Sequence, residues 1–268
     1  MKEHQKHWLY RHTIGLLPRS RFLYKISHIY LRHYFGFNYG LDSDDGEEWL
    51  ATHALKGKPN PVVFDVGANV GDWTLAILAL NPQVQVHAFE PATAAFEKMA
   101  TRVAAPNVRL NRLGVGAERG TLTFYEYSVS AVSTFHANEG RLPVNSYLVD
   151  IISISEYCHE NDINRIDFLK IDTEGHDFWV LQGAEPLLRD QQIEVVQLEY
   201  GPGNIDSRVL LKDVFSFLSQ LPYKVFRLYP RYLLPVPKYS TELENFINVN
   251  YVLIAQNQIS RYAHICRV

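Results

Sequence analysis

The chain has few cysteines and no long apolar segment. Cys158 and Cys266 are the only cysteines among its 268 residues. We therefore expect no disulfide framework, and we expect the protein to reside in a reducing compartment. No segment approaches the roughly 18 apolar residues of a membrane span, and residues 1–41 lack the apolar core of a signal peptide. Internal repeats and low-complexity segments are also absent. We therefore expect a soluble, cytoplasmic protein.

A strong net charge is also missing, although the charge is unevenly distributed. The net charge of −3 gives no bulk attraction to nucleic acid, so no nucleic-acid partner is expected. Residues 1–41 contain one acidic residue, Glu3, and seven basic ones: Lys2, Lys6, Arg11, Arg19, Arg21, Lys25 and Arg32. Apolar side chains such as Trp8 and Phe22 recur among them, partly at helical spacing. We expect residues 1–41 to form a helical extension. This extension could pack against the domain or form a homodimer, or it could contact a membrane surface or an anionic substrate.

The remaining residues, 42–268, are long enough and apolar enough for one α/β domain. Its most informative segment is a glycine-rich turn. Residues 62–66 form a short β-branched and aromatic run that predicts a buried strand, and residues 71–80 predict the following helix. Gly67 and Gly71 allow a ligand to approach the backbone, and the amides at the start of the helix would point towards that ligand. The segment therefore predicts a binding site for a cofactor that carries a nucleoside.

The spacing within this turn distinguishes between cofactors. The dinucleotide fingerprint G-x-G-x-x-G is absent, and the turn reads D-x-G-x-N-x-G, with Asp65 before Gly67, Asn69 and Gly71. A carboxylate there would repel a pyrophosphate and attract an ammonium group. S-adenosylmethionine carries an α-ammonium and no phosphate, so Asp65 favours it over NAD. The alternative is an aspartate that only caps the next helix.

Strand-like and helix-like segments alternate along the domain, which predicts a mostly parallel sheet with helices on both faces. We expect strands at 84–90, 108–115, 121–127, 166–172 and 195–200, and helices at 93–103, 178–189 and 208–220. Two β-rich segments, 223–229 and 246–255, are separated only by a proline-rich loop, so the last strand should be antiparallel. This order predicts a Rossmann-like, seven-stranded methyltransferase sheet rather than that of a dehydrogenase.

Carboxylates stand at three further predicted strand ends. Glu90 could accept both ribose hydroxyls of an adenosine, or could cap helix 93–103. Asp172 is followed by Glu174 and His176, a cluster that points to a site at the edge where open α/β sheets bind ligands; capping of helix 178–189 is the alternative. Glu199 ends the neighbouring strand. Asp172 and Glu199 could together hold Mg²⁺, or could bind substrate hydroxyls directly.

Four of these segments resemble the FkbM-type methyltransferase family, in its order and at its spacing, over about residues 42–255. They are VVFDVGANVG at 62–71, AFEP at 88–91, IDFLKIDTEGH at 166–176 and QLEYG at 197–201. The resemblance implies S-adenosylmethionine as methyl donor and a hydroxyl of a saccharide or natural product as acceptor. It also implies that Asp65, Gly67, Asn69, Gly71 and Glu90 bind the cofactor. The family's pattern allows an alanine at position 176.

We expect O-methylation, in which a general base removes the proton of the acceptor hydroxyl. His176 is the leading candidate, with Asp172 orienting it or holding the metal, and Glu174 beside them; a histidine that only starts a helix is the alternative. The loop 128–142 is a candidate lid over a small-molecule or glycan acceptor. An NAD-dependent oxidoreductase and a non-catalytic nucleotide-binding module are the rival functions, and N-methylation is a narrower one.

Overall fold

The computed structural model describes residues 3–13, 15, 17–34, 46–128, 133–138 and 140–267. The main strands are β1 (Val62–Val66), β2 (Gln85–Phe89), β3 (Val108–Asn111), β7 (Ile166–Ile171), β8 (Ile193–Tyr200), β9 (Tyr223–Tyr229), β10 (Tyr232–Pro235) and β11 (Val249–Ala255). The longer helices are α1 (Glu3–His12), α2 (Arg21–Tyr34), α3 (Glu47–Leu55), α4 (Asp72–Leu80), α5 (Thr93–Arg102), α6 (Ile154–Glu160), α7 (Asp177–Gly183) and α10 (Leu211–Leu218). Short helices are α8 (Glu185–Arg189), α9 (Gly203–Ser207) and α11 (Ile259–Tyr262).

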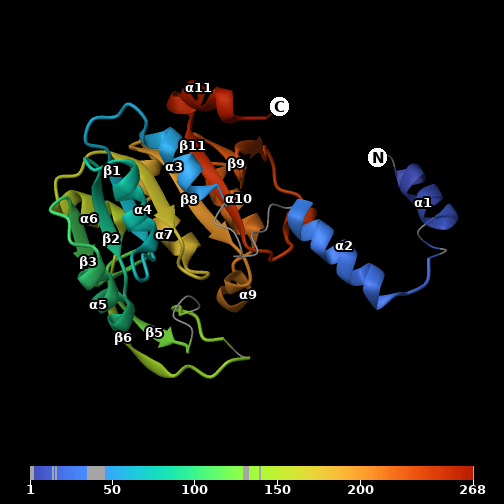
Figure 1. Ribbon diagram of the computed structural model, residues 1–268, viewed down its shortest axis with the longest axis horizontal. Coiled ribbons are helices and arrows are strands. Elements are labelled where there is room, and N and C mark those ends of the chain that lie inside the picture. The colour runs from blue at the N-terminus through green and yellow to red at the C-terminus, as the bar shows by residue number, and fades with distance from the viewer. Residues whose placement is uncertain are drawn as a thin grey trace.

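The described strands form one large sheet in the order β10-β9-β11-β8-β7-β1-β2-β3 (Figure 1). Strands β3, β2, β1, β7 and β8 are parallel, whereas β11 is antiparallel to both β8 and β9. The predicted mostly parallel sheet with an antiparallel last strand is therefore confirmed. Strand β10 adds an eighth strand at the edge through a hairpin with β9, and it lies within the proline-rich segment that we expected to be a loop.

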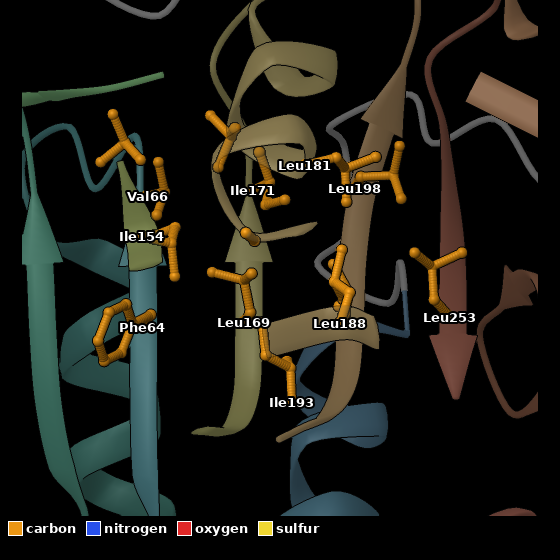
Figure 2. Close-up of a cluster of buried hydrophobic side chains, with 14 of the residues drawn as sticks. Phe64, Val66, Ile154, Leu169, Ile171, Leu181, Leu188, Ile193, Leu198 and Leu253 are labelled. Atoms are coloured by element: carbon orange, nitrogen blue, oxygen red, sulfur yellow. The ribbon is translucent and has the colours of Figure 1, made fainter. Parts of the chain in front are cut away.

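Helices cover both faces of this sheet because successive side chains of each central strand point to opposite faces. One face packs against α6, α7, α8 and α10, and the other against α3, α4 and α5. Figure 2 shows part of the first core. In β1, for example, Phe64 lies in the first core and Val63 in the second, and both are fully buried. Burial of a side chain of this size contributes roughly 1.5–3 kcal/mol.

A second sheet, in the order β4-β6-β5, was only partly predicted. It contains β4 (Gly114–Val115), β5 (Gly120–Glu126) and β6 (Asn145–Ile152). The expected strand 108–115 is thus divided into β3 and β4, which belong to different sheets. Strand β6 was missed because only its second half carries buried apolar side chains, so its alternation is weak.

Two predicted helices also differ from the structure. The expected helix 178–189 is divided into α7 and α8 at Ala184, just before Pro186, whose ring cannot continue a helix interior. The expected helix 208–220 is the shorter α10, preceded by the separate turn α9. Both changes follow from local chain geometry and leave the sheet order unaffected.

The N-terminal helices α1 and α2 extend away from the domain (Figure 1). The predicted boundary between an extension at 1–41 and a domain at 42–268 lies outside the described residues. A hydrogen bond joins α2 to the sheet: the hydroxyl of Tyr229 donates to the backbone oxygen of Tyr34 at 2.9 Å. None of the helices in the described part of the chain has the length and apolar character needed to cross a bilayer.

Candidate active site

The glycine-rich turn after β1 contacts the end of β7. Gly67 has φ +85°, a conformation that favours glycine, and a Cβ added there would lie 1.8 Å from the backbone oxygen of Asp172. Gly71 has φ +82° and caps the N-terminus of α4. The turn therefore approaches the neighbouring strand end more closely than any side chain would allow. This brings the first sequence motif and the acidic cluster to one edge of the sheet.

Glu90 is held at the tip of β2 by this same turn. The backbone amide of Asn69 donates to its Oε2 at 2.7 Å, and the amide of Ala92 donates to its Oε1 at 2.7 Å. The residue is 6% exposed, and burial raises the pKa of its carboxyl to about 7, although the two amides oppose that rise. Each oxygen can accept a further hydrogen bond, so the carboxylate can still receive ribose hydroxyls.

Asp65 takes a different position from its neighbours in the motif. Its Oδ2 accepts a hydrogen bond from Thr74 Oγ1 at 2.6 Å, and its Oδ1 is buried without a hydrogen-bond partner among the described residues. Burial raises the pKa of this carboxyl. Strand alternation places Asp65 on the face of α3 and α4, the same face as Lys170, which it opposes in register. Its contact with a cofactor ammonium stays a prediction.

A cavity lies at the carboxyl ends of β1, β2 and β7, where ligands of open α/β sheets bind. Its lining residues are Val66, Gly67, Asn69, Phe89, Glu90, Pro91, Leu113, Gly114, Val115, Phe124, Ser133, Phe135, Asp172, Thr173 and Glu174. Residues 113–115 and Phe124 were expected in strands but not at the site, because their approach to the cavity depends on how the second sheet packs against the first.

These residues fit S-adenosylmethionine. Asn69 lines the cavity, and its Oδ1 is buried without a partner among the described residues. The cofactor brings ammonium, hydroxyl and amino donors that unpaired acceptors need. The apolar side chains of Phe89 and Leu113 provide walls of the kind that an adenine ring requires. Carboxylate, amide and apolar groups therefore all match the expected cofactor.

Three carboxylates converge at the next part of this edge. One oxygen from each of Asp172, Glu174 and Glu199 lies within 4.8 Å of the others. The expected approach of Asp172 to Glu199 is thus observed, and Glu174 joins them. Burial, and then the charge of Asp172, raise the pKa of Glu174 to about 8 and the pKa of Glu199 well above its ordinary value. The carboxylates of the cluster therefore repel one another when ionised, and this repulsion favours the binding of a cation or of hydroxyl donors.

One buried cation partly balances these charges. Lys170 Nζ donates to Asp172 Oδ2 at 2.8 Å. Burial by itself would lower the pKa of Lys170, but the carboxylates of Asp172, Glu47 and Asp65 together outweigh burial, so the net pKa is raised. The sequence analysis missed this residue. Its position two residues before Asp172 in one strand, which puts both side chains on the same face, was the available signal.

His176 lies away from the carboxylates. Its Nδ1 is 3.1 Å from Nε2 of His136, and its ring stacks on Trp179 with centroids 4.9 Å apart. It does not line the cavity that contains Glu90 and Glu174. Burial, and then His136, lower its pKa to about 3. The expected orientation of His176 by Asp172 is not observed, because the imidazole points into an aromatic cluster; its catalytic role is untested.

Part of the predicted lid covers the cavity. Thr134 Oγ1 donates to the backbone oxygen of Glu174 at 2.9 Å, and Ser133 and Phe135 line the cavity. Asn138 Nδ2 donates to Asp206 Oδ2 in α9 at 2.6 Å. Residues 133–138 thus connect the second sheet to the acidic edge. Residues 129–132 and 139 of the predicted lid lie outside the described part of the chain.

Curated relatives of this chain are methyltransferases. It is 28% identical over 188 residues to the 31-O-demethyl-FK506 methyltransferase FkbM of Streptomyces tacrolimicus, covering 57% of this chain and 72% of that protein. It is 26% identical over 168 residues to the hexuronic acid methyltransferase AglP of Haloferax volcanii, covering 62% and 64%. It is 23% identical over 194 residues to the 2-O-methyltransferase NoeI of Sinorhizobium fredii, covering 63% and 78%.

The family model of the methyltransferase FkbM domain matches residues 65–225. This match spans more than half of the chain and includes the glycine-rich turn, Glu90, the three converging carboxylates and the segment 133–138. The chain therefore belongs to the FkbM methyltransferase family.

Proposed function

We propose that this protein transfers a methyl group from S-adenosylmethionine to a hydroxyl group of a saccharide or another hydroxylated natural product. One observation carries the proposal: the carboxylates of Asp172, Glu174 and Glu199 converge beside the cavity that Glu90 and the glycine-rich turn line. Carboxylates suit an acceptor that presents several hydroxyl donors. The names of the relatives, which include a hexuronic acid methyltransferase and a 2-O-methyltransferase, support this class of acceptor.

The cofactor, when bound, supplies an electrophilic methyl group on a sulfonium. Glu90 would hold its ribose end by accepting hydrogen bonds from the ribose hydroxyls, and the unpaired side-chain oxygen of Asn69 would accept from a second donor. An acceptor hydroxyl bound beside this methyl group would lose its proton to a Glu174 carboxylate oxygen, which would make the acceptor oxygen nucleophilic. Phe124 and Phe135 help to keep water from the reacting groups.

Glu174 is a better placed base than His176. It lines the cavity, and its pKa of about 8 lies near neutrality, where a general base is most effective. His176 lies outside the lining and has a pKa of about 3. Asp172, paired with Lys170 through its Oδ2, lines the same cavity and is placed to orient the acceptor. We therefore assign proton removal to Glu174 and keep Asp172 as the orienting group.

Mg²⁺ is the metal that we propose for this edge, with Asp172 and Glu199 as its ligands. Mg²⁺ prefers oxygen donors, commonly one or two carboxylates together with water and substrate oxygens. A cation there would relieve the repulsion within the cluster and would lower the pKa of a coordinated hydroxyl. The alternative is direct hydrogen bonding of these carboxylates to acceptor hydroxyls. Turnover that survives removal of divalent ions by EDTA would favour the alternative.

The experiment begins with calorimetric titration of the chain by S-adenosylmethionine and, in parallel, by NAD. We expect saturable binding of the first only, which would also separate this function from an oxidoreductase. Hydroxylated acceptors are then screened by mass spectrometry for a methylated product. Formation of a product distinguishes an enzyme from a non-catalytic binding module, and its structure distinguishes O- from N-methylation.

Variants test the assignment of roles. Glu174→Gln should reduce kcat by about 100-fold or more, because general-base catalysis is typically worth that much, and should leave cofactor affinity almost unchanged. Glu97→Gln, an exposed carboxylate on α5, is the matched control and should retain full activity. Full turnover by Glu174→Gln would remove Glu174 from the mechanism. Failure of the unmodified chain to bind the cofactor would contradict the proposal itself.

A further inference from the structure

The two N-terminal helices expose more large apolar side chains than the rest of the described surface. Eleven of the nineteen large hydrophobic residues exposed in the described part of the chain lie between positions 8 and 34. They are Trp8, Tyr10, Leu17, Phe22, Leu23, Tyr24, Ile26, Ile29, Tyr30, Leu31 and Tyr34. Scattered apolar side chains are normal on a protein surface, but a concentration of this kind indicates an interaction site.

Helix α2 separates these side chains from its basic ones. Phe22, Ile26 and Ile29 follow the spacing i, i+4, i+7, which places them along one face of the helix, and they are 69%, 47% and 54% exposed. Arg21, Lys25 and His28 follow the same spacing one residue earlier. Each residue turns the helix by about 100°, so the side chains of the apolar set point, on average, about 100° away from those of the basic set. Leu23 and Tyr30 widen the apolar face on the side away from the basic set. The helix is thus amphipathic along its whole length.

The charge of this region selects its partner. Between residues 4 and 34 the sequence contains no aspartate or glutamate. A helix with an apolar, aromatic face and a purely basic polar face binds in the plane of a membrane interface, where anionic headgroups attract its lysines and arginines. Tyr24, Tyr30 and Tyr34 suit that layer, because a tyrosine places its ring among acyl chains and its hydroxyl in water.

The position of α2 relates this surface to the active site. Its last residue, Tyr34, accepts a hydrogen bond from Tyr229 at the end of β9. Because β9 runs parallel to β8, this end lies at the same edge of the sheet as Glu199. Only β11 separates β9 from β8, so the two strands are about 10 Å apart. A surface that binds α2 therefore lies close to the acidic edge.

We propose that α2, together with α1, docks this protein on an anionic lipid surface. The helix lies in the interface with Phe22, Ile26 and Ile29 towards the acyl chains and with Arg21 and Lys25 towards the headgroups. If the proposed hydroxyl methylation holds, the acceptor is presented at that surface, as a lipid-linked or membrane-proximal molecule. The docking itself does not depend on the reaction, so each can fail without the other.

Co-sedimentation of the full chain with vesicles tests the docking. The unmodified chain should bind vesicles that contain phosphatidylglycerol, should bind pure phosphatidylcholine vesicles much more weakly, and should lose affinity as salt rises. The combined variant Phe22→Ser, Ile26→Ser, Ile29→Ser should bind at least about 100-fold more weakly, because three apolar side chains no longer leave water. The pair Arg21→Glu, Lys25→Glu should weaken binding by about 30-fold or more.

Two controls keep the outcome decisive. Leu148→Ser and Lys98→Glu change an exposed apolar and an exposed basic residue of the domain, and should leave vesicle binding unchanged. Equal binding by the α2 variants and the unmodified chain would overturn the proposal. So would the absence of vesicle binding. If light scattering then showed an oligomer that the apolar-face variant dissociates, a second copy of the chain would be the partner of α2.

Discussion

The backbone oxygen of Asp172 occupies the space that a side chain at Gly67 would need. A Cβ at residue 67 would lie 1.8 Å from this oxygen, so the end of β7 and the turn after β1 are in contact through backbone alone. The contact sets the distance between the glycine-rich turn and the cluster of Asp172, Glu174 and Glu199. A substitution at residue 67 therefore tests how strongly the contact between the turn and the end of β7 stabilises the fold.

Gly67→Ala should lower the free energy of unfolding by about 3 kcal/mol or more, because the new Cβ must move the strand end and also adopts a positive φ. Gly57→Ala is the matched control. Gly57 also has a positive φ, +72°, but an added Cβ would meet no atom within 4 Å. That variant should lose only about 1 kcal/mol. Equal losses in urea unfolding of the two variants would show that backbone conformation, and not the contact with Asp172, accounts for the effect.

Glu90 should make the stability of the cofactor-free protein fall as pH rises from about 4.5 to about 7. Its carboxyl has a pKa of about 7 in the folded chain against 4.5 as its ordinary value, so the folded state binds the proton more tightly across that range. The unfolded state therefore binds fewer protons there, and stability decreases with pH by up to about 3 kcal/mol.

Urea unfolding of the unmodified chain and of Glu90→Gln at several pH values checks this effect. The glutamine cannot ionise, so the variant should lack this part of the decrease, while other titrating groups cancel in the comparison. Parallel pH curves for the two proteins would contradict the raised pKa. We also expect Glu90→Gln to weaken S-adenosylmethionine binding by about 10-fold or more, the usual effect of losing one hydrogen bond to a charged group.

His176→Ala should reduce stability and leave methyl transfer almost intact. The ring stacks on Trp179 and is hydrogen-bonded to His136, so its removal opens a cavity that costs about 2–4 kcal/mol. Turnover at a temperature where the variant remains folded, together with cofactor affinity, is the measurement. A variant that folds and binds cofactor but no longer turns over would restore His176 as the general base in place of Glu174.

Lys58 should contribute strongly to stability at the edge of the sheet opposite the site. Its Nζ lies 2.7 Å from Asp167 Oδ1 and also pairs with Glu194, and the side chains of both acids are at most 8% exposed. Lys58→Met leaves these carboxylates without their buried cation and should cost about 3–5 kcal/mol in urea unfolding. Lys56→Met, an exposed neighbour, should change stability by less than about 0.5 kcal/mol. A loss below about 1 kcal/mol for Lys58→Met would mean that water or Arg165 compensates.

Local sequence patterns predicted the sheet and the edge at which the site lies. The run 62–71 predicted a strand, a turn and a helix because each depends on neighbours in the chain: apolar side chains, glycines and the amides of a helix start. The carboxylates of Glu90, Asp172 and Glu199 could be assigned to one edge, because parallel strands end on the same side. These features, together with four motifs in family order, were sufficient to identify the family.

The tertiary structure decided which of these side chains face one another. Asp65 was expected to meet the cofactor ammonium, and strand alternation turns it towards α4, where Thr74 donates to it. His176 was expected beside Asp172, but contacts with His136 and Trp179 hold it in an aromatic cluster. Glu174 joins Asp172 and Glu199 because Glu174 and Gly175, both with positive φ, form a turn that packs against Gly203, just after β8. The sequence alone determined which motif residues lie at this edge of the sheet. The directions of their side chains, and the residues that complete the cavity, depend on contacts between residues far apart in the chain, which no local pattern records.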